Sequence, residues 1–231
     1  MKRIFIILLT FTGITFAAVA QESETMYVVK NSVITHRFNT AEIDSIIFYE
    51  PATDNVYING VVWATRNVGA PGKFVDNPED AGMFYQWNSK VGWSSKNPLV
   101  STNGSTSWNE NWNGYGATIW ETANNVCPEG YRIPTNVELQ SLVNAGNRIV
   151  TLNGVNGRIF GSDEPIFLPV AGRRRYGDHI EMPDITGAYH SSVSSGDIVY
   201  SLYFSLGPLT TPNIINSFSK KEGLLVRCVA E

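Results

Sequence analysis

The side chains with the strongest chemistry in this 231-residue chain are few and scattered. There are two cysteines, Cys127 and Cys228, and three histidines, His36, His179 and His190. A zinc or non-haem iron site needs several such ligands together, and these histidines are isolated from one another. The G-x-S-x-G motif of serine hydrolases is absent. The sequence therefore predicts no metal and no cofactor.

The charged clusters are short. Glu79-Asp80 and Asp163-Glu164 lie among loop-forming residues, and nothing near them predicts a closed apolar pocket that would shift a carboxyl pKa. We interpret both as solvated turns. Arg173-Arg174-Arg175 follows Gly172 and has two interpretations. It is either a solvated turn that keeps a sheet edge soluble, or a set of forked donors for an anionic or hydroxyl-rich ligand.

Composition limits the class of partner and of fold. The net charge is −4, only 16% of residues are charged and no long basic stretch is present, which argues against nucleic acid. Hydrophobic residues make up 43% of the chain, enough for one main domain with a small appendage. The six tryptophans either stack on sugars or pin long loops from buried positions. We favour the second, because residues 88–126 show little regular structure.

The N-terminus has the three parts of a secretory signal peptide. Lys2-Arg3 precedes an apolar run, and Ala18-Val19-Ala20 is an A-x-A cleavage site before Gln21. No nearby cysteine offers a lipid anchor point, and no later apolar run is long enough to span a bilayer. We expect residues 1–20 to be removed and the mature protein to be periplasmic, on the cell surface or extracellular.

Residues 21–50 predict a small β-hairpin module. Two β-prone runs, 26–30 and 33–38, flank Asn31-Ser32, and residues 45–49 predict a further strand. The stretch resembles a short module of exported Bacteroidetes proteins. Residues 51–54 form a polar break with a proline, which we interpret as a linker, so the larger domain is expected over residues 55–231.

The larger domain is organised around residues 127–135 and the helix after them. Thr135 and Glu138 have the spacing of a capping box, and Ala145-Gly146 supplies a C-terminal cap. The apolar residues expected on one helical face are Val137, Leu139, Leu142 and Val143. Elsewhere Asn59-Gly60 predicts a type I′ hairpin turn, and residues 167–172 and 199–206 predict strands.

Six stretches of this domain share their order and spacing with a known family. They are residues 60–69 (GVVWATRNVG), 82–87 (GMFYQW), 127–135 (CPEGYRIPT), 168–172 (LPVAG), 187–192 (GAYHSS) and 223–229 (GLLVRCV). Over about residues 55–230 the chain resembles the Fibrobacter succinogenes major paralogous domain, a family of exported bacterial domains of undetermined function. That family in turn resembles the C-type lectin-like fold of formylglycine-generating enzymes. The resemblance implies an α+β fold, a C-type lectin-like domain with short strands, one or two helices and long loops.

The two cysteines have two interpretations, a disulfide or a pair of buried free thiols. We favour a Cys127–Cys228 disulfide, because export favours oxidation and both cysteines lie in motifs of the resembled family.

The resemblance also implies where a ligand would bind. In a lectin-like fold the variable loops gather on one side, which the segments after Gly172 and around Tyr189 should approach. We therefore predict a ligand surface in which arginines donate and a tyrosine stacks. Its residues are Arg173, Arg174, Arg175, Tyr189 and His190. At His190 the family usually has tryptophan, so a site there would be altered.

The residues that catalyse the reaction in formylglycine-generating enzymes have no counterparts in this chain. Formylglycine-generating enzymes hold copper with a cysteine pair, and residues 187–206 contain no cysteine. The calcium-binding motifs of lectins correspond to Glu164-Pro165-Ile166 and Trp112-Asn113-Gly114, which lack the needed oxygens. We predict an exported, non-enzymatic surface or secreted binding protein for a glycan or a surface polypeptide. An enzyme distantly related to formylglycine-generating enzymes and a structural cell-surface component are the alternatives. The oligomeric state is not predicted.

Overall fold

The computed structural model describes residues 25–42, 54–162, 165–177, 179–207 and 210–231. The chain divides into two units, Met1–Pro51 and Ala52–Glu231. The expected signal peptide, the expected strand at residues 45–49 and the pair Asp163-Glu164 lie outside the described residues, as do residues 51–53 of the expected linker.

The smaller unit contains the predicted hairpin. Strands β1 (Thr25–Lys30) and β2 (Val33–Asn39) pair antiparallel, and a short 3-10 helix, η1 (Thr40–Glu42), follows. Asn31 and Ser32 form the turn with φ values of 52° and 63°. The hairpin and its two-residue turn are thus confirmed. Its apolar side chains other than Met26 are exposed, and a two-stranded hairpin of this kind is marginally stable by itself.

The described part of the larger unit contains four antiparallel sheets of short strands. The first is β3 (Asn55–Ile58), β4 (Val61–Asn67), β17 (Arg227–Ala230) and β7 (Tyr131–Arg132). The second is β12 (Ile180–Glu181), β11 (Arg173–Arg174), β16 (Gly223–Leu224), β5 (Met83–Gln86) and β6 (Gly92–Ser94). The third is β13 (Thr186–Ser195), β14 (Ile198–Ser205) and β15 (Asn213–Ser219). The fourth is β10 (Ile166–Pro169), β9 (Val155–Phe160) and β8 (Asn147–Leu152).

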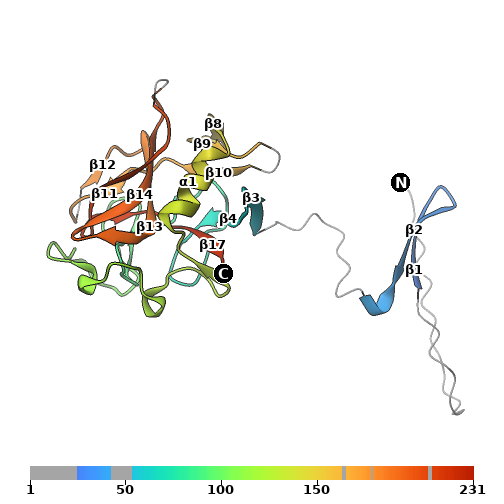
Figure 1. Ribbon diagram of the computed structural model, residues 1–231, viewed down its shortest axis with the longest axis horizontal. Helices are drawn as coiled ribbons and strands as arrows, with labels where there is room; N and C mark the ends of the chain where they lie inside the picture. The colour runs from blue at the N-terminus through green and yellow to red at the C-terminus, as the bar shows by residue number, and fades with distance from the viewer. Residues whose placement is uncertain (1–24, 43–53, 163–164, 178, 208–209) are drawn as a thin grey trace, which may run out of the picture. The chain divides into compact units, whose positions relative to one another are not determined.

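The described part of the larger unit has little helix. The α-helix α1 (Asn136–Asn144) packs against β13 and β14 (Figure 1), and two 3-10 turns, η2 (Gly114–Gly116) and η3 (Thr122–Asn124), interrupt the long segment before it. In the first sheet, β4 pairs with β17, so that Trp63 lies opposite Val229. The beginning and the end of the larger unit therefore lie side by side.

The predicted α+β, C-type lectin-like fold is wrong. Strands hold 47% of the described residues and helices 9%, with a single α-helix among them. The reason is visible after α1, where Asn153-Gly154 turns the chain from β8 into β9 with φ values of 48° and 85°. Short β-prone runs separated by such turns pair with their neighbours, and one nine-residue helix can cover only part of one sheet. The molecule is mainly β.

The start of α1 follows the sequence prediction closely. The Thr135 hydroxyl accepts a hydrogen bond from the Glu138 N–H at 3.2 Å, and the Glu138 carboxylate accepts one from the Thr135 N–H at 2.7 Å. The capping box is confirmed. The expected apolar face is only partly right: Leu139 and Leu142 are buried, whereas Val137 is 72% exposed.

Replacing Thr135 with alanine is expected to lower the free energy of unfolding by about 1 kcal/mol, because the Glu138 N–H loses its acceptor. Urea unfolding followed by tryptophan fluorescence measures this change. Val137→Ala is the matched control, since it alters an exposed side chain of the same helix and removes no cap. Equal destabilisation by both variants would show that the hydroxyl does not cap the helix.

Five of the six tryptophans are buried, as the favoured interpretation expected. Trp63, Trp87, Trp93, Trp108 and Trp120 are each at most 8% exposed. Trp112 is half-buried, and its indole N–H donates to the Trp87 carbonyl oxygen at 2.7 Å. Ring contacts join distant turns of the segment, for example Trp93 with Trp108 at 5.2 Å between centroids. These side chains fix a long segment that has little regular structure of its own.

Buried arginines tie other segments together. The Arg227 guanidinium donates to the Asn67 Oδ1 atom at 2.9 Å and to the Phe167 carbonyl oxygen at 2.9 Å. Burial lowers its pKa to about 10. Arg158 in β9 donates to the carbonyl oxygens of Ser205 at 2.9 Å and Thr210 at 2.7 Å. Each guanidinium offers five donors, so one side chain can satisfy several loop carbonyls at once.

Candidate functional site

The five residues of the predicted ligand surface do not form an exposed surface. Arg174, Tyr189 and His190 are each 0% exposed. Arg173 and Arg174 form β11, and Tyr189 and His190 lie in β13. Since a stacking face and free donors need solvent access, the arrangement expected from chain position is not present.

Arg173 and Arg175 are held by carboxylates. The Arg173 guanidinium lies 2.7 Å from a Glu222 oxygen and 2.8 Å from a Glu181 oxygen, and 4.4 Å from the centre of the Phe218 ring. Arg175 has a side chain that is 47% exposed and lies 3.4 Å from Glu181. These contacts join β11 to β12 and to the residue before β16. Of the three arginines, only Arg175 fits the earlier interpretation as part of a solvated turn beside a sheet edge.

Arg174 holds a loop in place. Its guanidinium donates to the carbonyl oxygens of Ser94 at 2.8 Å and Lys96 at 3.3 Å, to the Asn97 side chain at 3.3 Å, and to the Gly177 carbonyl oxygen. The loop after β6 and the turn after β11 are thereby fixed to one side chain. We interpret Arg174 as a structural residue.

Tyr189 is also a buried structural residue. Its hydroxyl donates to the Pro169 carbonyl oxygen at 2.7 Å, and its ring stacks on Phe204 at 6.0 Å. Burial raises the pKa of this phenol well above its ordinary value. The side chain therefore fastens the end of β10 to β13 and presents no face to a ligand.

His190 is a neutral, buried imidazole. Its Nε2 atom lies 2.7 Å from the Tyr85 carbonyl oxygen, so Nε2 carries the proton and donates. The ring packs edge-on against Trp120 at 5.3 Å, and Nδ1 has no hydrogen-bond partner among the described residues. Burial lowers the pKa of His190 to about 4.

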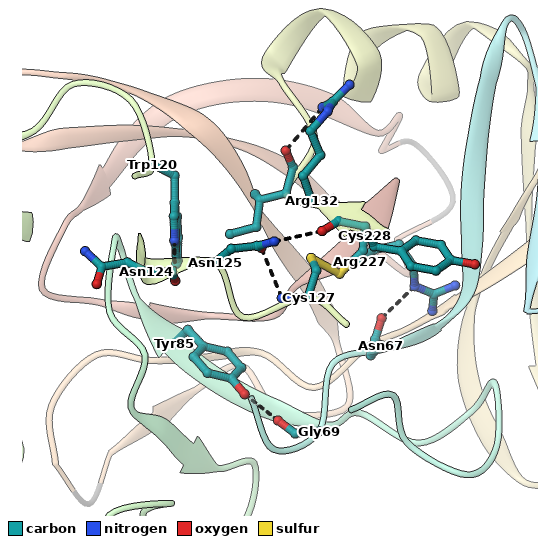
Figure 2. Close-up of a disulfide and its surroundings, with 12 residues drawn as sticks. Asn67, Gly69, Tyr85, Trp120, Asn124, Asn125, Cys127, Arg132, Arg227 and Cys228 are labelled. Carbon is teal, nitrogen blue, oxygen red and sulfur yellow. Dashed lines mark hydrogen bonds between the residues drawn. A yellow bond between two sulfur atoms is a disulfide. The ribbon is translucent and has the colours of Figure 1, made fainter. Parts of the chain in front are cut away.

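The predicted disulfide between Cys127 and Cys228 is present, with Cα atoms 6.0 Å apart. It fastens the segment before α1 to β17 (Figure 2). Asn125 supports it: its Oδ1 atom accepts from the Cys127 N–H at 3.1 Å, and its Nδ2 atom donates to the Tyr131 carbonyl oxygen at 2.7 Å. The disulfide interpretation is confirmed over free thiols.

A groove beside α1 collects uncharged polar side chains. We call it the α1 groove; its volume is about 610 Å³. Its polar lining residues are Asn59, Asn136, Gln140, Ser141 and Asn144. Val137, Tyr200 and Ile214 complete the described lining, which contains no Asp, Glu, His, Lys, Arg or Cys. The groove thus combines amides, a hydroxyl and one aromatic ring.

The walls of the α1 groove come from one helix, two strands and one turn. Asn136, Gln140 and Asn144 are four residues apart on α1 and so share one face of the helix. Tyr200 and Ile214 come from β14 and β15, and Asn59 from the turn between β3 and β4. The turn is fixed to the helix, because Asn59 Nδ2 donates to the Ser141 carbonyl oxygen and Ser141 Oγ donates to the Asn59 carbonyl oxygen, both at 3.0 Å.

Two other grooves have charged side chains in their linings, several of which hydrogen-bond to other parts of the protein. One of about 610 Å³ includes Glu79 and Asp80. Glu79 accepts from Asn153 at 2.8 Å, and Asp80 accepts from the backbone of Asn77 at 3.1 Å. The described lining of this groove contains no Phe, Tyr or Trp, and its one ring that could stack is the imidazole of His179. Of its three carboxylates, Glu79 and Asp80 therefore stabilise nearby turns, and Asp184 is the third.

The second of these grooves, of about 290 Å³, includes Trp120 and Arg132. Arg132 makes two hydrogen bonds to Glu138, at 2.6 and 2.9 Å. Although burial raises the pKa of Glu138, the hydrogen bonds from Arg132 and Thr135 lower it below the ordinary value. The arginine thus belongs to the cap of α1.

In the part of the chain that the structure describes, no three His, Cys, Asp or Glu side chains lie close enough together to bind a metal ion. Among these residues no helix is long and apolar enough to cross a membrane. Comparison with protein-family models, with curated proteins and with solved structures finds no match. The resemblance to the Fibrobacter family stays a hypothesis.

Sequence reasoning missed the α1 groove. The spacing of Asn136, Gln140 and Asn144 within a predicted helix was a usable signal, because residues four apart share a face. Nothing in the sequence placed Asn59 or Tyr200 beside that face. Those neighbours depend on how the β3–β4 hairpin and β14 pack against α1.

Proposed function

We propose that the protein is an exported, non-enzymatic surface or secreted binding protein that holds a glycan or a peptide in the α1 groove. The observation that carries this proposal is the groove's lining of amides and one serine hydroxyl around Tyr200. Such groups form hydrogen bonds with a polar ligand while a ring supplies contact area.

The same lining supports binding over catalysis. General acid and base catalysis relies mainly on His, Asp, Glu, Lys, Tyr or Cys, and of these the described lining has Tyr200 alone, with no second such group beside it. Ser141 lacks an adjacent base, because its hydroxyl donates to the Asn59 carbonyl oxygen. The disulfide supports export, since such bonds persist in oxidising compartments.

The test is a binding screen with the full chain, produced in a bacterial host and purified from the periplasm. The probes are immobilised neutral oligosaccharides, acidic oligosaccharides and extended peptides. We expect at least one probe to bind, and Tyr200→Ala to weaken that binding. Tyr176→Ala is the matched control, because Tyr176 is 47% exposed and is absent from the lining of the α1 groove.

Three results would contradict binding in the α1 groove without catalysis. They are binding that Tyr200→Ala leaves unchanged, chemical conversion of a bound probe, and failure of all probes to bind. Conversion would favour the enzyme alternative, and failure to bind would favour a structural surface component. Material retained in the cytoplasm with its N-terminus intact would contradict export.

A further inference from the structure

The α1 groove has the chemistry of a site for one class of ligand. We infer that it binds a neutral oligosaccharide, with Tyr200 as the stacking ring and the amides of Asn136, Gln140 and Asn144 as a row of hydrogen-bonding groups. This inference rests on the proposed function and narrows its ligand.

The first argument is charge. Anionic ligands such as uronic acids, sulfated sugars and acidic peptides are recognised by Arg or Lys, and the described lining has neither. Cationic ligands call for carboxylates, which it also lacks. Burying a charged ligand group beside uncharged amides would leave that charge without a partner. An uncharged ligand is the one that this lining suits.

The second argument is hydrogen-bonding type. A sugar hydroxyl is both donor and acceptor, and so is a side-chain amide. Gln140 Nε2 donates to Asn144 Oδ1 at 3.0 Å. This bond uses one donor of Gln140 and one acceptor position of Asn144, so both amides keep donors and acceptors for a ligand. It also fixes the orientation of both amides before the ligand arrives.

The third argument is shape. Helical rise places Asn136 and Asn144 about 12 Å apart along α1. That row is longer than one pyranose ring, so the site suits an oligosaccharide better than a monosaccharide. A peptide bound by strand addition would need an open sheet edge with free backbone groups. The α1 side of the groove offers side chains instead, because helical backbone groups bond within the helix.

Tyr200 is placed to stack. It lies in β14 two residues before Leu202, and therefore on the same face of the strand. Leu202 is fully buried in a cluster with Leu139 and Leu142 of α1, whereas Tyr200 is half-buried and lines the groove. The apolar stripe of the helix thus covers Leu202 and leaves the tyrosine ring at the margin.

The test measures the affinity of soluble neutral oligosaccharides of increasing length by calorimetry, with uronic-acid oligosaccharides and extended peptides in parallel. We expect neutral oligosaccharides to bind and affinity to grow beyond the monosaccharide. Tyr200→Ala should weaken binding roughly tenfold or more, and Gln140→Ala roughly threefold to tenfold. Tyr200→Phe should retain most of the affinity, because the ring remains.

The variants separate folding from binding. Gln140→Ala keeps a good helix former on α1, so its loss of affinity is not a loss of structure. Peptide binding that depends on Tyr200 would overturn this inference and leave the proposed function standing. Uronic-acid binding in the groove would overturn it in the same way. Absence of Tyr200-dependent binding by any probe would overturn both.

Discussion

Replacing Cys127 and Cys228 together with alanine is expected to lower the free energy of unfolding by about 4–5 kcal/mol. The bond joins residues 101 apart in sequence, so it restricts a long loop of the unfolded chain. Both cysteines are buried, which means that alanine also removes packed sulfur atoms. Urea unfolding of the wild type and the double variant, followed by tryptophan fluorescence, measures the difference.

A reductant provides the control. The wild type should lose a similar amount of stability in reductant, whereas the double variant should be insensitive to it. Mass mapping of non-reduced peptides should find Cys127 cross-linked to Cys228. Free thiols at both positions in protein purified from the periplasm, or equal stability with and without reductant, would show that the bond does not hold the fold together.

Features that a few neighbouring residues determine were predictable from the sequence. The cap of α1 depends on Thr135 and Glu138, three positions apart. The turn between β3 and β4 depends on Asn59 and Gly60, which have φ values of 48° and 85°. In both cases the backbone geometry is set by groups within one turn of chain, so residue type and spacing are enough.

Fold class and exposure depended on contacts between distant segments. The three adjacent arginines 173–175 are of the same residue type, yet Arg174 is the one of them that is fully buried. Strand alternation requires neighbours to face opposite ways but does not say which one faces inward. Two of the carbonyl oxygens that Arg174 binds belong to residues 94 and 96, far away in the sequence. Sequence reasoning had no means of pairing them.

The same limit explains the error at Tyr189 and His190. Both were expected at a surface, but β13 is covered on its two faces. Tyr189 packs with Phe204 on one side, and His190 with Trp120 on the other. A strand covered on both faces loses the alternation that separates inside from outside. The polar character of histidine suggested a surface position for His190, but a buried backbone carbonyl oxygen accepts the hydrogen bond from its one N–H.

Lowering the pH from neutral to about 4 is expected to destabilise the protein by on the order of 3 kcal/mol through His190 alone. Burial lowers its pKa to about 4 from an ordinary value of 6.5. The unfolded chain therefore binds a proton below 6.5, while the folded protein binds one only near 4. Between these values the unfolded state holds more protons, so stability rises with pH and falls as pH drops.

The structural cause of the lowered pKa is burial of His190, whose Nδ1 atom has no hydrogen-bond partner among the described residues. Protonation would place a charged N–H in the core beside Trp120, with no acceptor among the described residues. His190→Gln is the matched control, since its amide can still donate to the Tyr85 carbonyl oxygen but cannot titrate. Urea unfolding at neutral pH and at about pH 4 should show a smaller acid loss in this variant. Other titrating groups, including Glu138, are present in both proteins and cancel in the comparison. Equal acid losses, or a His190 nuclear magnetic resonance titration near the ordinary value, would show that the core does not hold this imidazole neutral.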